Sequence, residues 1–259
     1  MKRVILLSDL HAGHITGLTP PGWMFREERY PKLYAMQKEM WAKYRALIRK
    51  LGPVDVLIAN GDLIDGKGKR SGGTELVTTD LLEQGDMAVK ALQIWNADST
   101  FVLYGTPYHV TADSGEDVEK IIGEKLEAQV HSHAFIDVEG VVFDCKHKIG
   151  SSQIPWSKHT AISRERIHNF LWNAAEEGQP KANVFIRSHV HYFNYCGGID
   201  WLAMTLPALQ GPHTKFGARQ CSGVVDWGLV VMDVDKGKIV NWKPEIIRLE
   251  NFKQELIKV

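Results

Sequence analysis

Seven polar residues that follow short apolar runs constrain this 259-residue chain more than any other feature. Each run has the length of a buried strand, and the polar residue stands at or just after its end. The seven are Asp9, His11, Asp62, His109, His147, His189 and His191. Carboxylates and imidazoles from separate strand ends can surround two cations, which no single segment could do. The pattern therefore predicts a fold in which several strand ends meet at a two-metal site.

The first half of the chain alternates apolar runs with amphipathic segments. Apolar residues at three- and four-residue spacing predict a helix over 33–51, ended by Gly52 and Pro53, and a second helix starting near Leu81. Strands are predicted at 4–7, 54–59 and 101–104. Strands that alternate with helices indicate an α/β fold with parallel pairing, in which ligands bind beyond the carboxyl ends of the strands.

The second half of the chain is richer in strands. Glu139 and Gly140 predict a hairpin turn between strands at 130–138 and 141–146. A helix is predicted at 163–177, with Ser163 as its N-cap and Gly178 as its end. Further strands are predicted at 182–187, 193–196, 202–206, 229–234 and 239–248. We expect these strands to form a second sheet packed on the first, within one domain spanning residues 1–259.

Charge and composition restrict the cellular location and the binding partners that we expect for this chain. The formal net charge is zero, so no overall basic field indicates a nucleic-acid partner. No stretch approaches the roughly 20 apolar residues of a membrane span, and the run at 4–7 is too short for a secretory signal. The three cysteines lack a CxxC spacing and an even pairing. We expect a cytoplasmic protein with no membrane partner and no evident protein partner.

The spacing within the motifs predicts how they hold metal. Asp9 and His11 are two residues apart, so both side chains can project to the same side and grip one cation, and His189 and His191 repeat this spacing. Asp62 follows a glycine in a tight turn, where its two carboxylate oxygens can bridge two ions. Mixed carboxylate and imidazole ligands suit Mn, Fe or Zn better than Ca, and Mg prefers oxygen alone. We expect two divalent metal ions, with Mn favoured and Fe, Zn or Mg as alternatives.

Taken in order, these motifs resemble those of the calcineurin-like metallophosphoesterases. The chain carries D-x-H at 9–11, G-D-x-x-D at 61–65, a Gly-to-His turn at 105–109, a lone His147, and H-x-H at 189–191. The resemblance implies a four-layer α/β/β/α sandwich of two mixed sheets flanked by helices. It also implies two metal sites that share one carboxylate: Asp9, His11, Asp62 and His191 for one ion, and Asp62, His147 and His189 for the other.

The turn at 105–109 departs from the family pattern. The family has an Asn ligand there, followed by a His and an acidic residue, whereas this chain has Thr106, Pro107 and Tyr108 before His109, and Val110 after it. Thr106 is left as a weaker oxygen ligand for the second ion, with water as the alternative. For His109 two roles stay open: the family role of contacting substrate and protonating the leaving group, or direct ligation of metal.

The resemblance implies an enzyme that hydrolyses phosphate esters by attack of a hydroxide bridging two metal ions. We favour a phosphodiesterase, nuclease-like in the sense that its substrate is a nucleic acid or nucleotide. The nearest alternative is a phosphomonoesterase acting on nucleotides, proteins or metabolites. Lys67 and Arg70, in the glycine-rich loop after Asp62, are candidate substrate contacts, with a solvated loop as the alternative. The altered turn also keeps open a catalytically inactive metal-binding scaffold.

Overall fold

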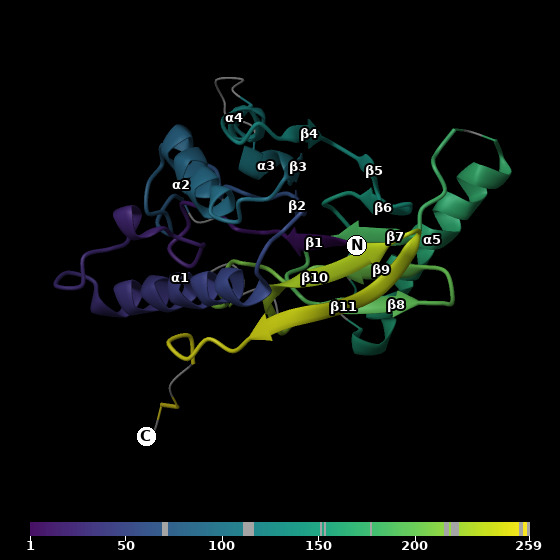
Figure 1. Ribbon diagram of the computed structural model, residues 1–259. Coiled ribbons are helices and arrows are strands. Elements are labelled where there is room, and N and C mark those ends of the chain that lie inside the picture. Colours follow the sequence, from purple (N-terminus) through teal and green to yellow (C-terminus); the bar gives the residue numbers. More distant parts are fainter. Residues whose placement is uncertain are drawn as a thin grey trace.

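The computed structural model describes residues 1–68, 72–110, 117–150, 152, 154–176, 178–214, 218, 223–253 and 256–257. Within these residues the strands form two sheets (Figure 1). The helices are η1 (Pro21–Trp23), α1 (Pro31–Leu51), α2 (Leu81–Gln93), α3 (Pro107–Val110), α4 (Val118–Lys125), η3 (Pro155–Ser157) and α5 (Lys158–Ala174). The strands are β1 (Lys2–Leu7), β2 (Val56–Ala59), β3 (Ser99–Leu103), β4 (Gln129–His131), β5 (Ala134–Val138), β6 (Val141–Cys145), β7 (Val184–Arg187), β8 (Asn194–Gly197), β9 (Leu202–Thr205), β10 (Trp227–Asp235) and β11 (Lys238–Ile247).

Both sheets are mixed. The first has the order β11-β10-β1-β2-β3-β4, in which β1 to β4 are parallel and β10 and β11 are antiparallel to their neighbours. The second has the order β5-β6-β7-β9-β8, in which β6, β7 and β9 are parallel. The expected architecture of two mixed sheets flanked by helices is therefore confirmed.

The layers follow from the alternation of side chains along each strand. On β1, Ile5 and Leu7 pack with α1 and α2 in one buried apolar cluster, whereas Val4 and Leu6 face the second sheet in another. On the outer face of the second sheet, Phe185 packs with residues of α5 in a third, smaller cluster. The order of layers is helices, sheet, sheet, helix (Figure 1).

Three sequence expectations differ from the structure. The predicted strand at 130–138 is two strands, because the chain leaves the first sheet after His131 and enters the second at Ala134. β10 and β11 belong to the first sheet, where β10 pairs with β1, and not to the second. The last helix begins at Lys158, and Ser163 is an interior residue whose hydroxyl donates to the carbonyl of His159.

The C-terminal end of α1 matches the expectation, and α2 begins at a capping residue. Gly52 ends α1 with a φ of 66°, a left-handed conformation that glycine adopts without strain. Asp80 caps α2 by accepting hydrogen bonds from the backbone amides of Leu82 and Glu83. None of the described helices is long and apolar enough to cross a membrane.

Buried hydrogen bonds of Tyr44 join α1 to α2 and to Trp95, which follows α2. The Tyr44 hydroxyl donates to the carbonyl of Ala91 at 2.9 Å and accepts from the Trp95 indole at 2.6 Å. Replacing Tyr44 with Phe keeps the ring but leaves two buried polar groups without a partner. We expect Tyr44→Phe to lower the free energy of unfolding by about 1–3 kcal/mol in urea titration. Tyr34→Phe, on the partly exposed side of the same helix, is the control and is expected to change it little.

Candidate metal centre

The seven predicted polar residues converge at the carboxyl ends of five strands. Asp9 and His11 follow β1, Asp62 follows β2, and His109 lies in the α3 turn after β3. On the second sheet, His147 follows β6, and His189 and His191 follow β7. Three groups of side chains bring ligand atoms within 4.8 Å of one another: Asp9, His11 and His191; His11, Asp62 and His109; and Asp62, His147 and His189. The structure therefore brings all seven together.

The backbone that carries these side chains is unusual. Among the described residues, eleven other than glycine have positive φ, and five of them are members of the site: Asp9 at 51°, His11 at 45°, Asp62 at 51°, His189 at 74° and His191 at 55°. The left-handed region costs an L-residue roughly 1–2 kcal/mol. Such strain persists only where the surroundings impose it, and it gathers at functional sites.

Backbone hydrogen bonds between the loops impose these conformations. The amide of Asp9 donates to the carbonyl of Gly61, and the amide of His11 donates to the carbonyl of Asp62, both at 3.0 Å. The amide of Ser188 donates to the carbonyl of His147 at 2.7 Å. The loops after β1 and β2 are thus fixed to each other, and so are those after β6 and β7.

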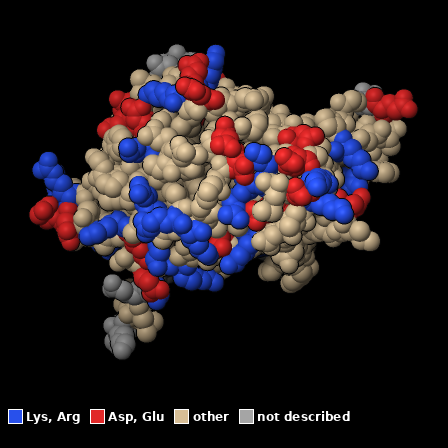
Figure 2. All heavy atoms as spheres, in the orientation of Figure 1, with Lys and Arg blue, Asp and Glu red and all other residues tan. Residues whose placement is uncertain are grey.

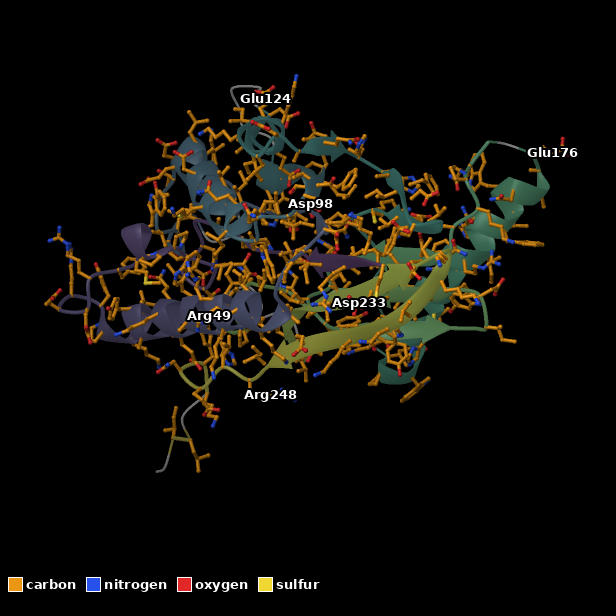
Figure 3. All side chains as sticks on the ribbon, in the orientation of Figure 1. Arg49, Asp98, Glu124, Glu176, Asp233 and Arg248 are labelled. Carbon is orange, nitrogen blue, oxygen red and sulfur yellow. The ribbon has the colours of Figure 1, made fainter. Side chains whose placement is uncertain are left out.

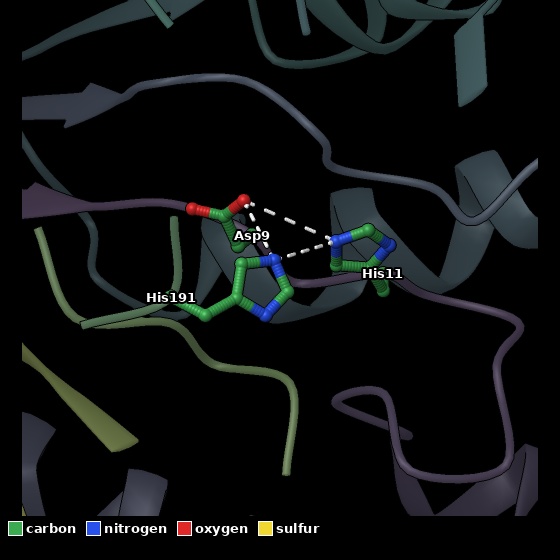
Figure 4. Close-up of side chains that lie close together, drawn as sticks. All are labelled: Asp9, His11 and His191. Carbon is green, nitrogen blue, oxygen red and sulfur yellow. Dashed lines mark hydrogen bonds and ion pairs between the residues drawn. The ribbon is translucent and has the colours of Figure 1, made fainter. Parts of the chain in front are cut away.

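The first cluster consists of Asp9, His11 and His191 (Figure 4). The Nε2 atom of His191 lies 3.1 Å from Oδ1 of Asp9, and Nε2 of His11 lies 3.9 Å from the same oxygen. The two Nε2 atoms are 3.3 Å apart. Three ligand atoms thus face a common point, as one cation would require.

The second cluster is centred on Asp62. Its Oδ2 atom lies 2.9 Å from Nε2 of His147 and 3.7 Å from Nδ1 of His189. Burial alone would raise the pKa of the Asp62 carboxyl, but the neighbouring His147 and His189 hold it well below its ordinary value. Burial lowers the pKa of His147, yet Asp62 raises it to about 9. In the absence of other cations, histidine charge compensates the buried carboxylates.

Two buried atoms test whether a cation fits here. Oδ1 of Asp9 and Nε2 of His147 have no solvent contact and no hydrogen bond of good geometry within the described residues. Leaving a buried polar atom unpaired costs roughly 1–3 kcal/mol. A carboxylate oxygen and an imidazole lone pair are both metal-ligand atoms. The residues present therefore fit a divalent cation in each cluster.

Hydrogen bonds on the far side of the rings fix which nitrogen faces the clusters. Nδ1 of His11 donates to Oδ1 of Asp65 at 2.9 Å, and Nδ1 of His147 donates to the carbonyl of Asn60 at 2.7 Å. Nε2 is therefore the nitrogen that each ring presents to its cluster, and it would ligate a cation that displaces its proton. Partners of this kind orient the ligating histidines of known metal sites and set their tautomer.

His109 lies between the clusters. Its Nδ1 donates to the backbone carbonyl of Asp65 at 2.6 Å, so this carbonyl orients the ring in place of the acidic residue that Val110 replaces. Its Nε2 lies 3.9 Å from Oδ2 of Asp62, and its ring meets that of His11 edge to face. Burial and the nearby His11 lower the pKa of His109 to about 4, which leaves it a neutral acceptor at Nε2.

Thr106 occupies the place expected for the missing Asn. Its hydroxyl lies 3.1 Å from both Oδ2 of Asp62 and Nδ1 of His189, and its amide donates to Oδ1 of Asp62 at 2.5 Å. The turn thus brings an oxygen to the second cluster. The same hydroxyl is hydrogen-bonded to Asp62, so it is not fully available to ligate a cation.

Two glycines allow these close approaches. A Cβ added at Gly105 would lie 2.2 Å from both the amide nitrogen and Oδ1 of Asp62, and one at Gly61 would lie 2.5 Å from Nδ1 of His147. A Cβ atom essentially never lies this close to another heavy atom to which it is not bonded. Gly61 also has a φ of 86°. The glycines before Asp62 and Thr106 are therefore required by the packing of the site.

Other residues at the site carry weaker sequence signals. Asp65 orients His11 with its carboxylate and His109 with its carbonyl. Glu119 on α4 is fully buried behind the site and accepts from the amide of Gly105, and burial raises its pKa to about 8. No local pattern marks Glu119 as a partner of that turn. Lys67 is exposed, and Arg70 lies outside the described residues.

Comparison with known proteins finds solved structures whose fold is distantly similar to that of this chain. No protein-family model matches the chain, and no curated protein matches its sequence. Similar solved structures include wild-type Vps29 from Entamoeba histolytica complexed with Zn²⁺, at 11% identity and a TM-score of 0.47, covering 96% of this chain and 99% of that one. An archaeal phosphodiesterase is 14% identical with a TM-score of 0.45, and the match covers 95% of this chain and 99% of that one. A predicted phosphoesterase from Streptococcus pneumoniae is 12% identical with a TM-score of 0.40, and the match covers 95% of this chain and 98% of that one. Likeness this distant says nothing of the reaction of this chain.

The contact between Asp65 and His11 provides a test of the first cluster. We expect Asp65→Asn to weaken the tighter step of Mn²⁺ or Zn²⁺ binding by about 10- to 100-fold in calorimetric titration, because the carboxylate no longer orients the His11 ring. The carbonyl that orients His109 is retained in this variant. Asp86→Asn, at an exposed carboxylate of α2 paired with Lys125, is the matched control. Equal affinity in the two variants would contradict the role of Asp65.

Proposed function

We propose that this protein is a metal-dependent phosphoesterase that hydrolyses phosphodiester bonds with two divalent cations. One observation carries the proposal: two clusters of carboxylate and imidazole ligands adjoin each other, and each has a buried ligand atom without a hydrogen bond of good geometry. Asp9, His11 and His191 would hold one cation, and Asp62, His147 and His189 the other. The His11, Asp62 and His109 group joins the clusters and supports Asp62 as the shared ligand.

The donor set supports Mn²⁺, with Fe or Zn²⁺ next, because imidazole nitrogen and carboxylate oxygen are combined. Two such cations would supply positive charge at the phosphoryl oxygens and a nucleophile at neutral pH. The chain's own contribution is orientation. Asp65 and Asn60 set the histidine tautomers, and the interlocked loops hold the carboxylates in place.

His109 is the residue we assign to proton transfer. Its Nδ1 proton is held by the Asp65 carbonyl, so Nε2 has a free lone pair facing Asp62. Nε2 would accept a proton from the attacking water and then deliver it to the leaving oxygen, and the ring returns to its starting state. This assignment keeps the role that the motif resemblance implies for His109.

The charges around the site support a diester rather than a monoester substrate. In the described part of the chain, the cationic partners of Asp9, Asp62 and Asp65 are all histidines. Arg187, close by in sequence, is buried and paired with Asp144 and Glu165. A phosphodiester carries one negative charge, whereas a monoester dianion would need more cationic contacts. The face in Figure 2 mixes both signs of charge.

Hydrolysis of bis-p-nitrophenyl phosphate and p-nitrophenyl phosphate in parallel tests the proposal. With Mn²⁺ we expect turnover, faster for the diester, that a chelator abolishes and that added Mn²⁺ restores. Asp62→Asn should reduce the rate by at least about 100-fold, because a shared ligand matters more than the outer partners of a metal site. Asp86→Asn should retain full activity.

Two results would change the assigned function, and a third would refute the metal site. Faster turnover of the monoester would assign a phosphomonoesterase. Bound metal without turnover of either substrate would favour an inactive scaffold. Absence of bound metal in the wild-type protein would refute the site.

The Thr106 hydroxyl provides a separate prediction about the second cluster. We expect Thr106→Asn to tighten the weaker of two metal-binding steps by about 10-fold, because an amide oxygen is a better ligand than a hydroxyl hydrogen-bonded to Asp62. Thr106→Val, which removes only the hydroxyl, should weaken that step. The measurement is metal titration by calorimetry with metal analysis. Identical titrations for all three proteins would place Thr106 outside the coordination sphere.

A further inference from the structure

Gln84 is a fully buried glutamine of α2 that lies outside the metal clusters. Its Oε1 atom accepts from the amide of Gly66, and its Nε2 atom donates to the carbonyls of Gly66 and Thr78, each at 2.9 Å. Both hydrogens of the carboxamide are therefore used, and its oxygen binds the backbone of the loop that follows β2. Because a buried amide is costly without such partners, these bonds determine where the side chain lies.

Close packing on both sides fixes Gln84 further. Gly13 lies against its carboxamide, since a Cβ added there would lie 2.4 Å from Cδ of Gln84. Next along α2, a Cβ at Gly85 would lie 3.3 Å from Cγ1 of Val118, so α2 packs tightly on α4. The helix α4 is the one that carries Glu124, labelled in Figure 3. Gln84 thus extends from a helix held by its neighbour to the loop after β2.

The peptide between Asp65 and Gly66 connects Gln84 to His109. Its N–H donates to Oε1 of Gln84 at 2.9 Å, and its C=O accepts from Nδ1 of His109 at 2.6 Å. In a trans peptide these two groups point in opposite directions, so the glutamine, the peptide and the imidazole form one chain of hydrogen bonds. Hydrogen bonds in a chain polarise one another. The bond to Gln84 therefore makes the carbonyl a stronger acceptor for the His109 proton.

The His109 ring depends on this peptide for its orientation. The next residue, Val110, has an apolar side chain that cannot accept the Nδ1 proton. Gly66 also packs against the backbone of His109, since a Cβ added to this glycine would lie 2.9 Å from the His109 carbonyl oxygen. A rotation of the 65–66 peptide would therefore remove the acceptor of the Nδ1 proton and disturb the turn that carries the ring.

We propose that Gln84 is a positioning residue for proton transfer, which acts through the 65–66 peptide to keep the proton of His109 on Nδ1. It rests on the proposed function, in which Nε2 accepts a proton from the attacking water and returns it to the leaving oxygen. That step needs a lone pair on Nε2. Without Gln84 the peptide is free to rotate, and a ring that carries its proton on Nε2 cannot accept another there.

Gln84→Met tests this role, because it keeps the size of the side chain and removes all three hydrogen bonds. Two diesters are compared: bis-p-nitrophenyl phosphate, which releases a stable phenolate, and diphenyl phosphate, whose leaving oxygen needs a proton more. We expect kcat for diphenyl phosphate to fall by at least about 10-fold, since general acid–base catalysis supplies about 10²- to 10⁴-fold. The fall for the nitrophenyl ester should be smaller, and KM should change little for either.

Gln37→Met is the matched control. Gln37 is equally buried, and its carboxamide binds the backbone of Phe25 and Ile15 instead. Its loss should lower stability and leave the ratio of the two rates unchanged. Circular dichroism checks that each variant is folded.

Nitrogen-15 NMR of histidine-labelled protein, with and without Zn²⁺, measures the tautomer of His109 directly. Its signal is assigned by its loss in His109→Gln. We expect the wild-type ring to carry its proton on Nδ1, and Gln84→Met to move part of the population to Nε2. Gln84→Glu should retain the Nδ1 proton, because burial favours the neutral carboxyl, which still accepts from the Gly66 amide.

An unchanged tautomer in Gln84→Met would overturn the proposal, and so would equal falls in kcat for the two diesters. A wild-type His109 protonated on Nε2 would overturn it without any variant, even where a variant does not fold. Absence of turnover in the wild-type protein would refute the proposed function instead, and the tautomer would then decide the role of Gln84 alone.

Discussion

The burial of two carboxylates among imidazoles is the constraint on which the rest of the site depends. Asp9 and Asp62 are both fully buried, and an isolated buried charge is too costly to persist. Burial raises the pKa of the Asp9 carboxyl, yet the neighbouring His191 lowers it to about 2, so the carboxylate stays ionised. The charge must be balanced by histidine protons or by metal ions. Two divalent cations would also balance it, and they would bind Oδ1 of Asp9 and Nε2 of His147, which form ion pairs but no hydrogen bond of good geometry.

The division between strands and loops explains how such a site is held. Neighbouring strands of each sheet end close together and are rigid. The loops that follow them carry the candidate ligands in left-handed backbone conformations. Bonds such as the Asp9 amide to the Gly61 carbonyl tie each loop to the loop beside it. The strain at any one ligand is therefore offset by its neighbours, because no single loop can relax alone.

The sequence predicts the parts of this structure that depend on local pattern. The strand ends and their polar residues follow from apolar runs, and both long helices of the first half follow from apolar spacing. The separation of β4 from β5 could not be predicted, because Ser132 and His133 give no stronger turn signal than many exposed pairs. The pairing of β10 with β1 joins residues more than 220 positions apart, and hydrophobic pattern does not encode it.

The residues of the candidate site also fall into those that local sequence pattern predicts and those that it does not. Those that reach the clusters directly follow strand ends and are visible as motifs. Those that orient them act through contacts distant in sequence: Asp65 is 54 residues from His11, and Glu119 reaches back to Gly105 from a different helix. The Thr106 hydroxyl is visible in the sequence, but its simultaneous contact with Asp62 and His189 is not.

A buried ion network links the metal centre to α5. Arg187, the last residue of β7, is fully buried, and its guanidinium pairs with Asp144 of β6 and Glu165 of α5. Buried ion pairs rarely stabilise a fold more than apolar packing would, but removing one partner leaves the other charge buried without compensation. Their effect here is positional, since Arg187 fixes the strand end that leads to His189 and also fixes α5 on the sheet. Helix α5 is thus anchored to the same strand end that leads to two of the candidate metal ligands.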